Sequence, residues 1–200
     1  MTFDLEPGKA IAVTGRSGAG KSLLLRALGG LETLSEGRLS LAGAPVGHHD
    51  EAVWNNLRKH LGLVLDQAAL LHDLSLEENL AFPLVKARLA TQDLNARLEH
   101  ALVTFNLHPW RSTDVTRLSP TQIRRALLAR ALIMEPKILL LDSPFDGLDP
   151  EARRELVLDL DRLVRRQHVA LLFTCHDVAG FEQLADTVFL LERGQLTKVR

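Results

Sequence analysis

The residues most clearly suited to a chemical task form a glycine-rich segment at 15–22, with the sequence G-R-S-G-A-G-K-S. The segment fits a phosphate-binding loop, because it follows an apolar, strand-like run and opens a helical one. Its glycines permit a tight backbone path that turns successive N–H groups toward a phosphate, and a helix N-terminus adds partial positive charge. The candidate phosphate-binding residues are Gly15, Arg16, Ser17, Gly18, Ala19, Gly20, Lys21, Ser22 and Leu23.

Two side chains of this segment have separate expected tasks. The Lys21 ammonium should reach the β- and γ-phosphates of a nucleoside triphosphate, and the Ser22 hydroxyl should ligate Mg²⁺. A glycine-rich turn that binds nothing is the alternative, but the order of strand, loop and helix favours phosphate binding. ATP and Mg²⁺ are therefore the expected ligands.

A carboxylate at the end of a second apolar run completes the expected metal site. Residues 138–141 are apolar, and Asp142 follows them at the place where a Walker B aspartate holds Mg²⁺, directly or through water. Alone, such an aspartate would be interpreted as a cap on the end of a strand. Beside a phosphate-binding loop it favours metal binding.

The elements that must position these groups are visible in the hydrophobic pattern. Short apolar runs bounded by turn residues predict strands at 10–13, 61–65, 138–141, 169–174 and 187–191. Helical periodicity predicts helices at 20–28, 51–59, 76–81, 91–105, 120–134, 150–166 and 178–184. Strands that alternate with helices predict an α/β fold with a mainly parallel sheet covered on both faces, where ligands bind beyond the carboxyl ends of strands.

One stretch departs from that alternation. Residues from about 68 to 134 contain helical segments with no convincing strand between them. We therefore expect a single domain over 1–200, whose core of about 1–67 and 135–200 carries an inserted helical subdomain at about 68–134. A chain of 200 residues with 46% hydrophobic content suffices for one well-buried domain.

Composition argues against nucleic acid as a partner, against an intrachain disulfide and against a membrane-spanning helix. The net charge of -1 gives no electrostatic footprint for nucleic acid, and the five arginines from Arg111 to Arg130 are expected to form a solvated helix face. Cys175 is the single cysteine, so no intrachain disulfide can form and a reducing cytosol is expected. No stretch approaches the ~20 apolar residues of a membrane helix, so we expect a protein that reaches a membrane only through a partner.

Further motifs, in order along the chain, resemble the ABC ATPase family over nearly its whole length. Gln67 follows LGLVL as the family's Q-loop glutamine does, DGLD ends at Asp149 like the D-loop, and His176 follows a strand like the switch histidine. LSPTQ stands where the family has its LSGGQ signature, at Leu118, Ser119, Pro120, Thr121 and Gln122. The resemblance implies a RecA-like P-loop NTPase fold in which Ser22, Gln67 and Asp142 surround Mg²⁺.

The resemblance also implies partners. Two such domains, identical or different, would dimerise head to tail, with each ATP between one phosphate-binding loop and the other subunit's signature. Their closure would drive a membrane permease docked from the cytosolic side on residues 71–84. The stretches 65–84 and 143–153 are similar to ATPases of Mla-type phospholipid transporters, which extends the expectation to lipid cargo.

Departures from the family pattern predict impaired catalysis. Ser143 occupies the position of the catalytic glutamate, and a serine cannot act as a general base near neutral pH, which removes about 10² to 10⁴-fold in rate. His176 is the expected substitute, because it should lie near the γ-phosphate. The expected catalytic set is therefore His176, Gln67 and an impaired Ser143.

The signature and the N-terminal segment depart as well. Ser119 should cap a helix with Pro120 at its first position, but proline lacks an N–H and Thr121 crowds the approach to a partner's phosphate. Asp66 stands at a position where the family usually has an aromatic residue. The 14 residues before Gly15 leave no room for the family's hairpin with an adenine-stacking aromatic, and Phe3 lies in the wrong strand for that task, so affinity for the base should fall.

The sequence leaves two functions open. The first is the ATP-binding subunit of an ABC transporter, with slow hydrolysis. The alternative is a non-hydrolysing regulatory or structural subunit paired with an active ABC ATPase. Several residues are expected to be structural instead: His48 and His49 in a solvated loop, Cys175 as a small buried residue, and Trp54 and Trp110 in packing.

Overall fold

The computed structural model describes residues 2–33, 36–41, 44–46, 51–65, 70–177, 179–181 and 183–200, without the side chains of residues 44 and 52. Its main sheet has the strand order β4-β5-β6-β1-β7-β8, and every pairing is parallel except β7 with β8. The strands are Ala10–Thr14 (β1), Leu61–Val64 (β4), Ile138–Leu141 (β5), Ala170–Cys175 (β6), Thr187–Glu192 (β7) and Gln195–Lys198 (β8). The expected mainly parallel sheet is confirmed.

The helices alternate with these strands. They are Lys21–Leu28 (α1), Glu51–Leu57 (α2), Leu76–Lys86 (α3), Thr91–Thr104 (α4), Pro120–Leu132 (α5) and Pro150–Gln167 (α6), with short 3₁₀ turns at Arg58–His60, His108–Trp110 and Val115–Arg117. A separate antiparallel pair, Leu39–Leu41 (β2) and Ala44–Val46 (β3), had not been predicted. Strands of three residues are too short for their alternation to stand out from a loop.

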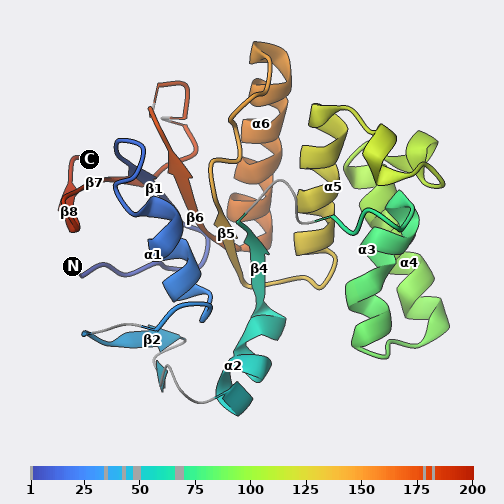
Figure 1. The fold of residues 1–200 in the computed structure, drawn as a ribbon, viewed down its shortest axis with the longest axis horizontal. Coiled ribbons are helices and arrows are strands. Elements are labelled where there is room, and N and C mark those ends of the chain that lie inside the picture. Colours follow the sequence, from blue (N-terminus) through green and yellow to red (C-terminus); the bar gives the residue numbers. More distant parts are fainter. Residues whose placement is uncertain are drawn as a thin grey trace.

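The sheet has a different helical cover on each face. Because successive strand residues point to opposite faces, Val13 packs in one cluster with Leu25 of α1, whereas Ala12 joins another with Leu160 of α6. Figure 1 shows α1 and α6 on either side of the central strands. Trp54 on α2 is 1% exposed, which confirms its packing role.

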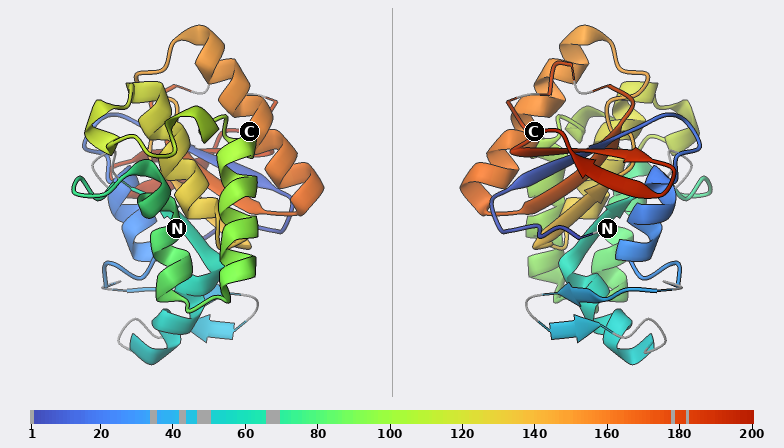
Figure 2. Two further views of the ribbon diagram at one scale, coloured as in Figure 1. Left: turned by 90° about the vertical axis from the view of Figure 1, so that its right-hand side faces the viewer. Right: turned by 90° about the vertical axis from the view of Figure 1, so that its left-hand side faces the viewer.

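Helices α3, α4 and α5 gather beyond the edge strand β4 (Figure 1), and α3 and α4 lie toward the viewer in the left view of Figure 2. Their buried leucines share one hydrophobic cluster with β5 and β6. At the start of α3, a capping box joins Ser75 and Glu78. The helix then continues through Pro83 to Lys86, beyond the expected end at 81. An interior proline costs about 3 kcal/mol, and the complete burial of Leu80 and Leu84 offsets it.

Two expectations are wrong within the described residues. Residues 179–180 and 183–184 form turns where a helix was expected over 178–184, because Gly180 has a φ of +89° and the Asp177 carboxylate accepts a hydrogen bond from the Ala179 N–H. The five arginines from Arg111 to Arg130 do not form one solvated face. Arg117 is exposed, but Arg111 bridges Glu77 and Glu99, and Arg124 is only 5% exposed.

Within the part of the chain that the structure describes, no helix is long and apolar enough to span a bilayer. Four residues discussed above, His48, His49, Asp66 and Gln67, lie outside the described residues.

Candidate functional site

The glycine-rich loop connects β1 to α1 and uses its glycines for two different reasons. A Cβ atom on Gly15 would lie 2.4 Å from the carbonyl oxygen of Leu191 in β7, so only glycine fits there. Gly18 and Gly20 have open space around them, but their φ values of +78° and +99° lie in the left-handed region. The expected tight backbone path is present.

The N-terminus of α1 has no side-chain cap, because Gly20 is its N-cap. Helix α4 also lacks one, at Ala90, whereas α3, α5 and α6 are capped by Ser75, Ser119 and Asp149. The first N–H groups of a helix need an external partner when no side chain caps them. An anion is the natural partner, because these groups carry the positive end of the helix dipole.

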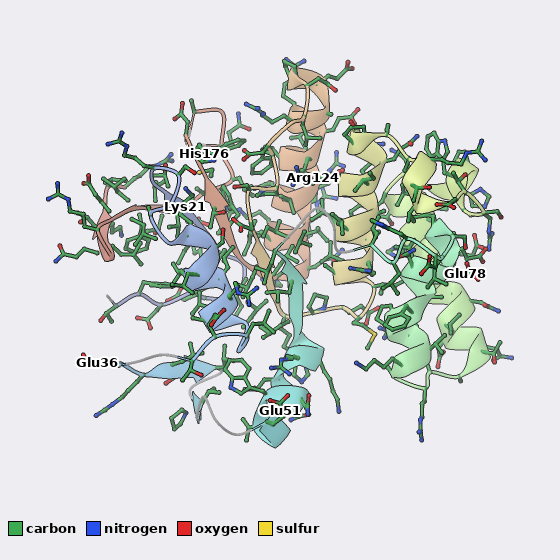
Figure 3. The ribbon with its side chains drawn as sticks, viewed as in Figure 1. Lys21, Glu36, Glu51, Glu78, Arg124 and His176 are labelled. Atoms are coloured by element: carbon green, nitrogen blue, oxygen red, sulfur yellow. The ribbon has the colours of Figure 1, made fainter. Side chains whose placement is uncertain are left out.

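Lys21 lies folded against this loop (Figure 3). Its ammonium donates to the carbonyl oxygens of Gly15, at 2.7 Å, and Arg16, at 3.1 Å, and the residue is 6% exposed. Burial of an ammonium is costly unless it is hydrogen-bonded. The carbonyls of its own loop therefore hold the charge at the edge of the anion site.

Asp142 is held by a residue that the sequence pattern did not reveal. The hydroxyl of Thr174, at the end of β6, donates to the Asp142 carboxylate at 2.5 Å and accepts from the Ser143 N–H at 2.9 Å. Thr174 is completely buried. It thus fixes both the carboxylate and the start of the following turn. The one available signal was a hydroxyl residue at the end of an otherwise apolar strand.

A cavity of about 280 Å³ brings the separate motifs together. Its lining residues come from the phosphate-binding loop, the end of β5 and the end of β6: Ser17, Gly18, Gly20, Lys21, Ser22, Leu23, Asp142, Ser143 and His176. This edge of the sheet is where parallel folds bind ligands. The expected loop, Walker B and switch residues are therefore neighbours, although they are far apart in sequence.

The residues present fit a magnesium-nucleotide complex better than a metal ion alone. Among the described residues, no group of three or more His, Cys, Asp or Glu side chains could hold a metal. Ser22 and Asp142 both line the cavity. Mg²⁺ is usually held by one or two carboxylates together with substrate phosphates, so this sparse set suits a nucleotide-bound ion.

The groups beside the cavity offer no carboxylate at the usual general-base position. Ser143 has a φ of +46°, an uncommon conformation for a residue other than glycine. The His176 side chain is 55% exposed, and its Nε2 lies 3.7 Å from the Asp146 carboxylate. Its carbonyl oxygen accepts a hydrogen bond from Thr14 at 3.0 Å. His176 is therefore anchored through its backbone, and its ring is accessible.

The signature segment forms the N-terminus of α5. Ser119 is the N-cap and Pro120 the first helical residue, as expected, and Gln122 completes a reciprocal capping box by accepting from the Ser119 N–H at 2.8 Å. All five signature residues are described, and none of them lines the cavity. This chain alone therefore does not place its signature against its own phosphate-binding loop.

Asp149, the expected D-loop aspartate, caps α6. Hydrogen bonds from the N–H groups of Ala152 and Glu151 lower the pKa of its carboxyl group. The carboxylate is therefore ionised at neutral pH and is used to stabilise the helix.

Two other expectations concern side chains near the site. The Phe3 ring packs on Phe189, with centroids 5.7 Å apart, so it belongs to the packing of β7. Cys175 is 3% exposed, and burial raises the pKa of its thiol to about 12. A thiol in that state is not a nucleophile at neutral pH, which confirms its structural role.

Comparisons with known proteins agree with this geometry. A family model described as "ABC transporter" matches residues 1–146. A sulfate/thiosulfate import ATP-binding protein of Thermosynechococcus vestitus is 35% identical over 200 residues, which cover 100% of this chain and 58% of the relative. A methionine import ATP-binding protein of Paraburkholderia xenovorans is 32% identical over 198 residues, covering 99% of this chain and 51% of the relative. The chain thus spans somewhat over half the length of these curated relatives.

Solved structures resemble the whole chain. The cbiO1 protein of Clostridium perfringens, described as part of an ABC transporter complex, matches with a TM-score of 0.89 and 26% identity, over 98% of this chain and 78% of that one. The ATP-binding cassette MJ0796 matches with a TM-score of 0.89 at 24% identity, over 99% of this chain and 88% of that one, which supports the fold.

Proposed function

Because the chain belongs to the ABC transporter family, we propose that it binds ATP with Mg²⁺ and serves as the ATP-binding subunit of a transporter. The proposal is that binding and slow hydrolysis are coupled to a membrane permease. The observation that carries it is the cavity where the open N-terminus of α1, the Lys21 ammonium and the Asp142 carboxylate meet.

In this proposal each group acts on a different part of the nucleotide. The N–H groups of residues 15–22 bind the phosphates, and Lys21 exchanges its carbonyl partners for phosphate oxygens. Ser22 and Asp142, with Gln67, hold the magnesium ion. The bound Mg²⁺ neutralises phosphate charge and polarises the phosphoryl group. Thr174 keeps Asp142 oriented, as a hydrogen-bonded neighbour does for many metal ligands.

Slow hydrolysis follows from the position of Ser143 beside the cavity. A serine hydroxyl cannot take a proton from water near neutral pH, so the chain lacks the usual general base there. His176 is the proposed substitute, because it lines the same cavity and its ring is accessible. A neutral imidazole can orient a water or accept its proton.

A second ATP-binding subunit would complete the site. The signature segment 118–122 does not line the cavity in its own chain. In the proposed head-to-tail dimer, each signature faces the partner's nucleotide, and the Ser119 hydroxyl is still able to donate there. Pro120 removes one N–H from that contact, which should weaken closure. The partner can be a second copy or a different ATPase.

The permease is proposed to dock on the loop 71–75 and on α3. Leu71, Phe82 and Val85 there are 38%, 48% and 62% exposed. The loop is shaped by Asn79, which is completely buried and exchanges hydrogen bonds with the backbone of Leu71 in both directions. This surface would place the chain on the cytoplasmic face of the membrane through its permease.

The transported cargo is the most specific part of the proposal. The relatives named above are import proteins, for sulfate or thiosulfate and for methionine, which favours import. Lipid cargo, implied by the likeness of residues 65–84 and 143–153 to Mla-type ATPases, stays a prediction. The permease that copurifies with the chain would identify the cargo class.

Turnover separates this function from its alternative, a nucleotide-locked subunit paired with an active ATPase. The alternative is favoured by Ser143 and Pro120, which suit retention of ATP without hydrolysis. Purified chain with its permease should release phosphate faster when cargo is added, and Lys21→Ala should abolish that rise. Retained ATP and a rate that cargo does not change would instead support the alternative.

A further inference from the structure

Arg124 is a buried cation that the motifs above do not use. It lies on α5, five residues after the N-cap Ser119, and is 5% exposed. Figure 3 shows it between α5 and α6. A guanidinium stays charged in proteins, and burying it is costly unless its N–H groups have partners. The identity of those partners therefore indicates what the residue is for.

Its partners are two backbone carbonyls of the turn that follows the Walker B strand. Nη1 donates to the Ser143 oxygen at 3.1 Å, and Nη2 donates to the Asp146 oxygen at 2.6 Å. The planar fork of an arginine fixes the distance and direction between two acceptors, which a flexible lysine does not. Arg124 therefore holds both ends of the segment 143–146 at once.

That segment has a conformation that needs support. Ser143 has a φ of +46° and precedes Pro144, which makes the position unfavourable on two counts. The Ser143 carbonyl also accepts from the Asp146 N–H at 3.2 Å, so the turn and the arginine share one acceptor. Such conformations persist where surrounding contacts determine them, and Arg124 supplies two of these contacts.

The other side of the same turn belongs to the nucleotide site. The Ser143 N–H donates to Thr174, whose hydroxyl donates to the Asp142 carboxylate. The Asp146 carboxylate lies 3.7 Å from His176 Nε2. Three hydrogen bonds, through Thr174 and Ser143, thus connect the Asp142 carboxylate to the Arg124 guanidinium. Two contacts, through Asp146, connect the guanidinium to the His176 ring.

We propose that Arg124 is a positioning residue that couples the ATP-Mg²⁺ site to the signature helix α5. Nucleotide binding moves the turn at 143–146, and the guanidinium transmits that movement to the helix whose first residues face the partner subunit. The inference rests on the proposed function, because it requires ATP binding at the cavity. It does not require hydrolysis or a particular partner.

Arg125, the next residue along the helix, provides a matched control. It forms an ion pair with Glu155, so it also joins α5 to α6, but among the described residues it has no hydrogen bond or ion pair with the turn at 143–146. Removing Arg125 tests the loss of a cation and of a contact between α5 and α6. Removing Arg124 also removes a cation, and in addition it removes the two hydrogen bonds to the turn at 143–146.

Hydrogen–deuterium exchange of the full chain, with and without ATP-Mg²⁺, tests the coupling. In the parent, ATP-Mg²⁺ should change deuterium uptake in peptides covering residues 118–132. Arg124→Gln should reduce that change at least threefold while ATP affinity, measured by calorimetry, stays within twofold. Arg125→Gln should keep the full change, and Arg124→Lys should keep part of it, because an ammonium can reach one carbonyl. A purely structural role would not remove an ATP-dependent difference at unchanged affinity.

The outcomes separate the two proposals. Failure of the parent to bind ATP-Mg²⁺ would overturn the proposed function. Binding with no response in α5, a full response in Arg124→Gln, or an equal loss in Arg125→Gln would overturn the coupling alone. If Arg124→Gln does not fold, Arg124→Lys decides, since a full response at parental affinity would overturn the inference and a reduced one would support it.

Discussion

Two helix N-termini of this protein, those of α1 and α5, are each expected to face a nucleotide phosphate, yet they are built in opposite ways. The N-terminus of α1 begins at Gly20 with no side-chain cap, which leaves its first N–H groups for an external anion. The N-terminus of α5 is closed by the Ser119–Gln122 capping box, and Pro120 contributes no N–H. The first end is prepared to bind an anion, and the second is already satisfied internally.

The difference separates two steps that a transporter ATPase must perform. In the proposed function, nucleotide binding depends on the loop, Lys21 and Asp142, which line one cavity. Closure around a partner's nucleotide would depend on α5, where the phosphate-binding groups are reduced. The comparison predicts a chain that binds ATP normally but closes and hydrolyses weakly.

The largest expected effect comes from Ser143→Glu, on the nucleotide side. If the missing general base limits chemistry, phosphate release should rise at least about tenfold, and up to about 10⁴-fold. Single-turnover assays with labelled ATP measure it, with Ser143→Gln as the matched control that has no base. An unchanged rate would mean that chemistry is not limited by residue 143.

Thr174→Val removes the hydroxyl that orients Asp142 while keeping the shape of the side chain. The Ser143 N–H and the Asp142 carboxylate lose a buried partner, which costs about 1–3 kcal/mol. Magnesium-dependent ATP affinity should therefore fall about tenfold in a calorimetric titration. Thr174→Ser keeps the hydroxyl and should retain most of the affinity. Equal affinity in the valine variant would show that Asp142 needs no such support.

A smaller effect is expected from the double variant Pro120→Gly and Thr121→Gly, on the signature side. One restored N–H is worth about 0.5–1.5 kcal/mol, so ATP-dependent association with a second ATP-binding subunit should tighten about threefold to tenfold. Sedimentation in the presence of ATP-Mg²⁺ measures it. ATP affinity of the isolated chain should stay within about twofold, and a change there would contradict the separation of the two helix ends.

The smallest effect concerns the stability of the helical region in acid. The hydrogen bond from Arg111 lowers the pKa of Glu77 from its ordinary value of 4.5. A lowered folded-state pKa stabilises the protein above about pH 4.5, and that stability is lost as pH falls through the folded value. Denaturant titrations should show the free energy of unfolding fall below about pH 5. Glu77→Gln should flatten that fall, and Glu36→Gln, at an exposed position, should leave it unchanged.

The α/β pattern and the phosphate-binding loop could be predicted because local rules determine them. Apolar runs of four to six residues identify buried strands, and the glycine pattern has one well-defined backbone solution. The position of Asp142 followed from the end of its strand. The caps at Ser119 and Pro120 followed from the helix-start rule, and the structure confirms both.

Other features depend on contacts between distant segments, which no local pattern records. Thr174 became part of the site only through the pairing of β5 with β6. The sequence pattern places Arg124 on a charged helix face, whereas the structure buries it against the turn at 143–146. The described residues of the range 178–184 are not helical, because the positive φ of Gly180 outweighed the helical periodicity.

The central claim is that the α1 N-terminus and Lys21 bind a triphosphate with its metal, and calorimetry with ATP-Mg²⁺ tests it most directly. We predict saturable heat for the parent chain and for Lys9→Ala, which changes an exposed lysine directly before β1. Lys21→Ala should bind at least about tenfold more weakly, since a charge-assisted hydrogen bond contributes about 1.5–3 kcal/mol. No heat from the parent at millimolar ATP-Mg²⁺, or equal affinity in Lys21→Ala, would contradict the account.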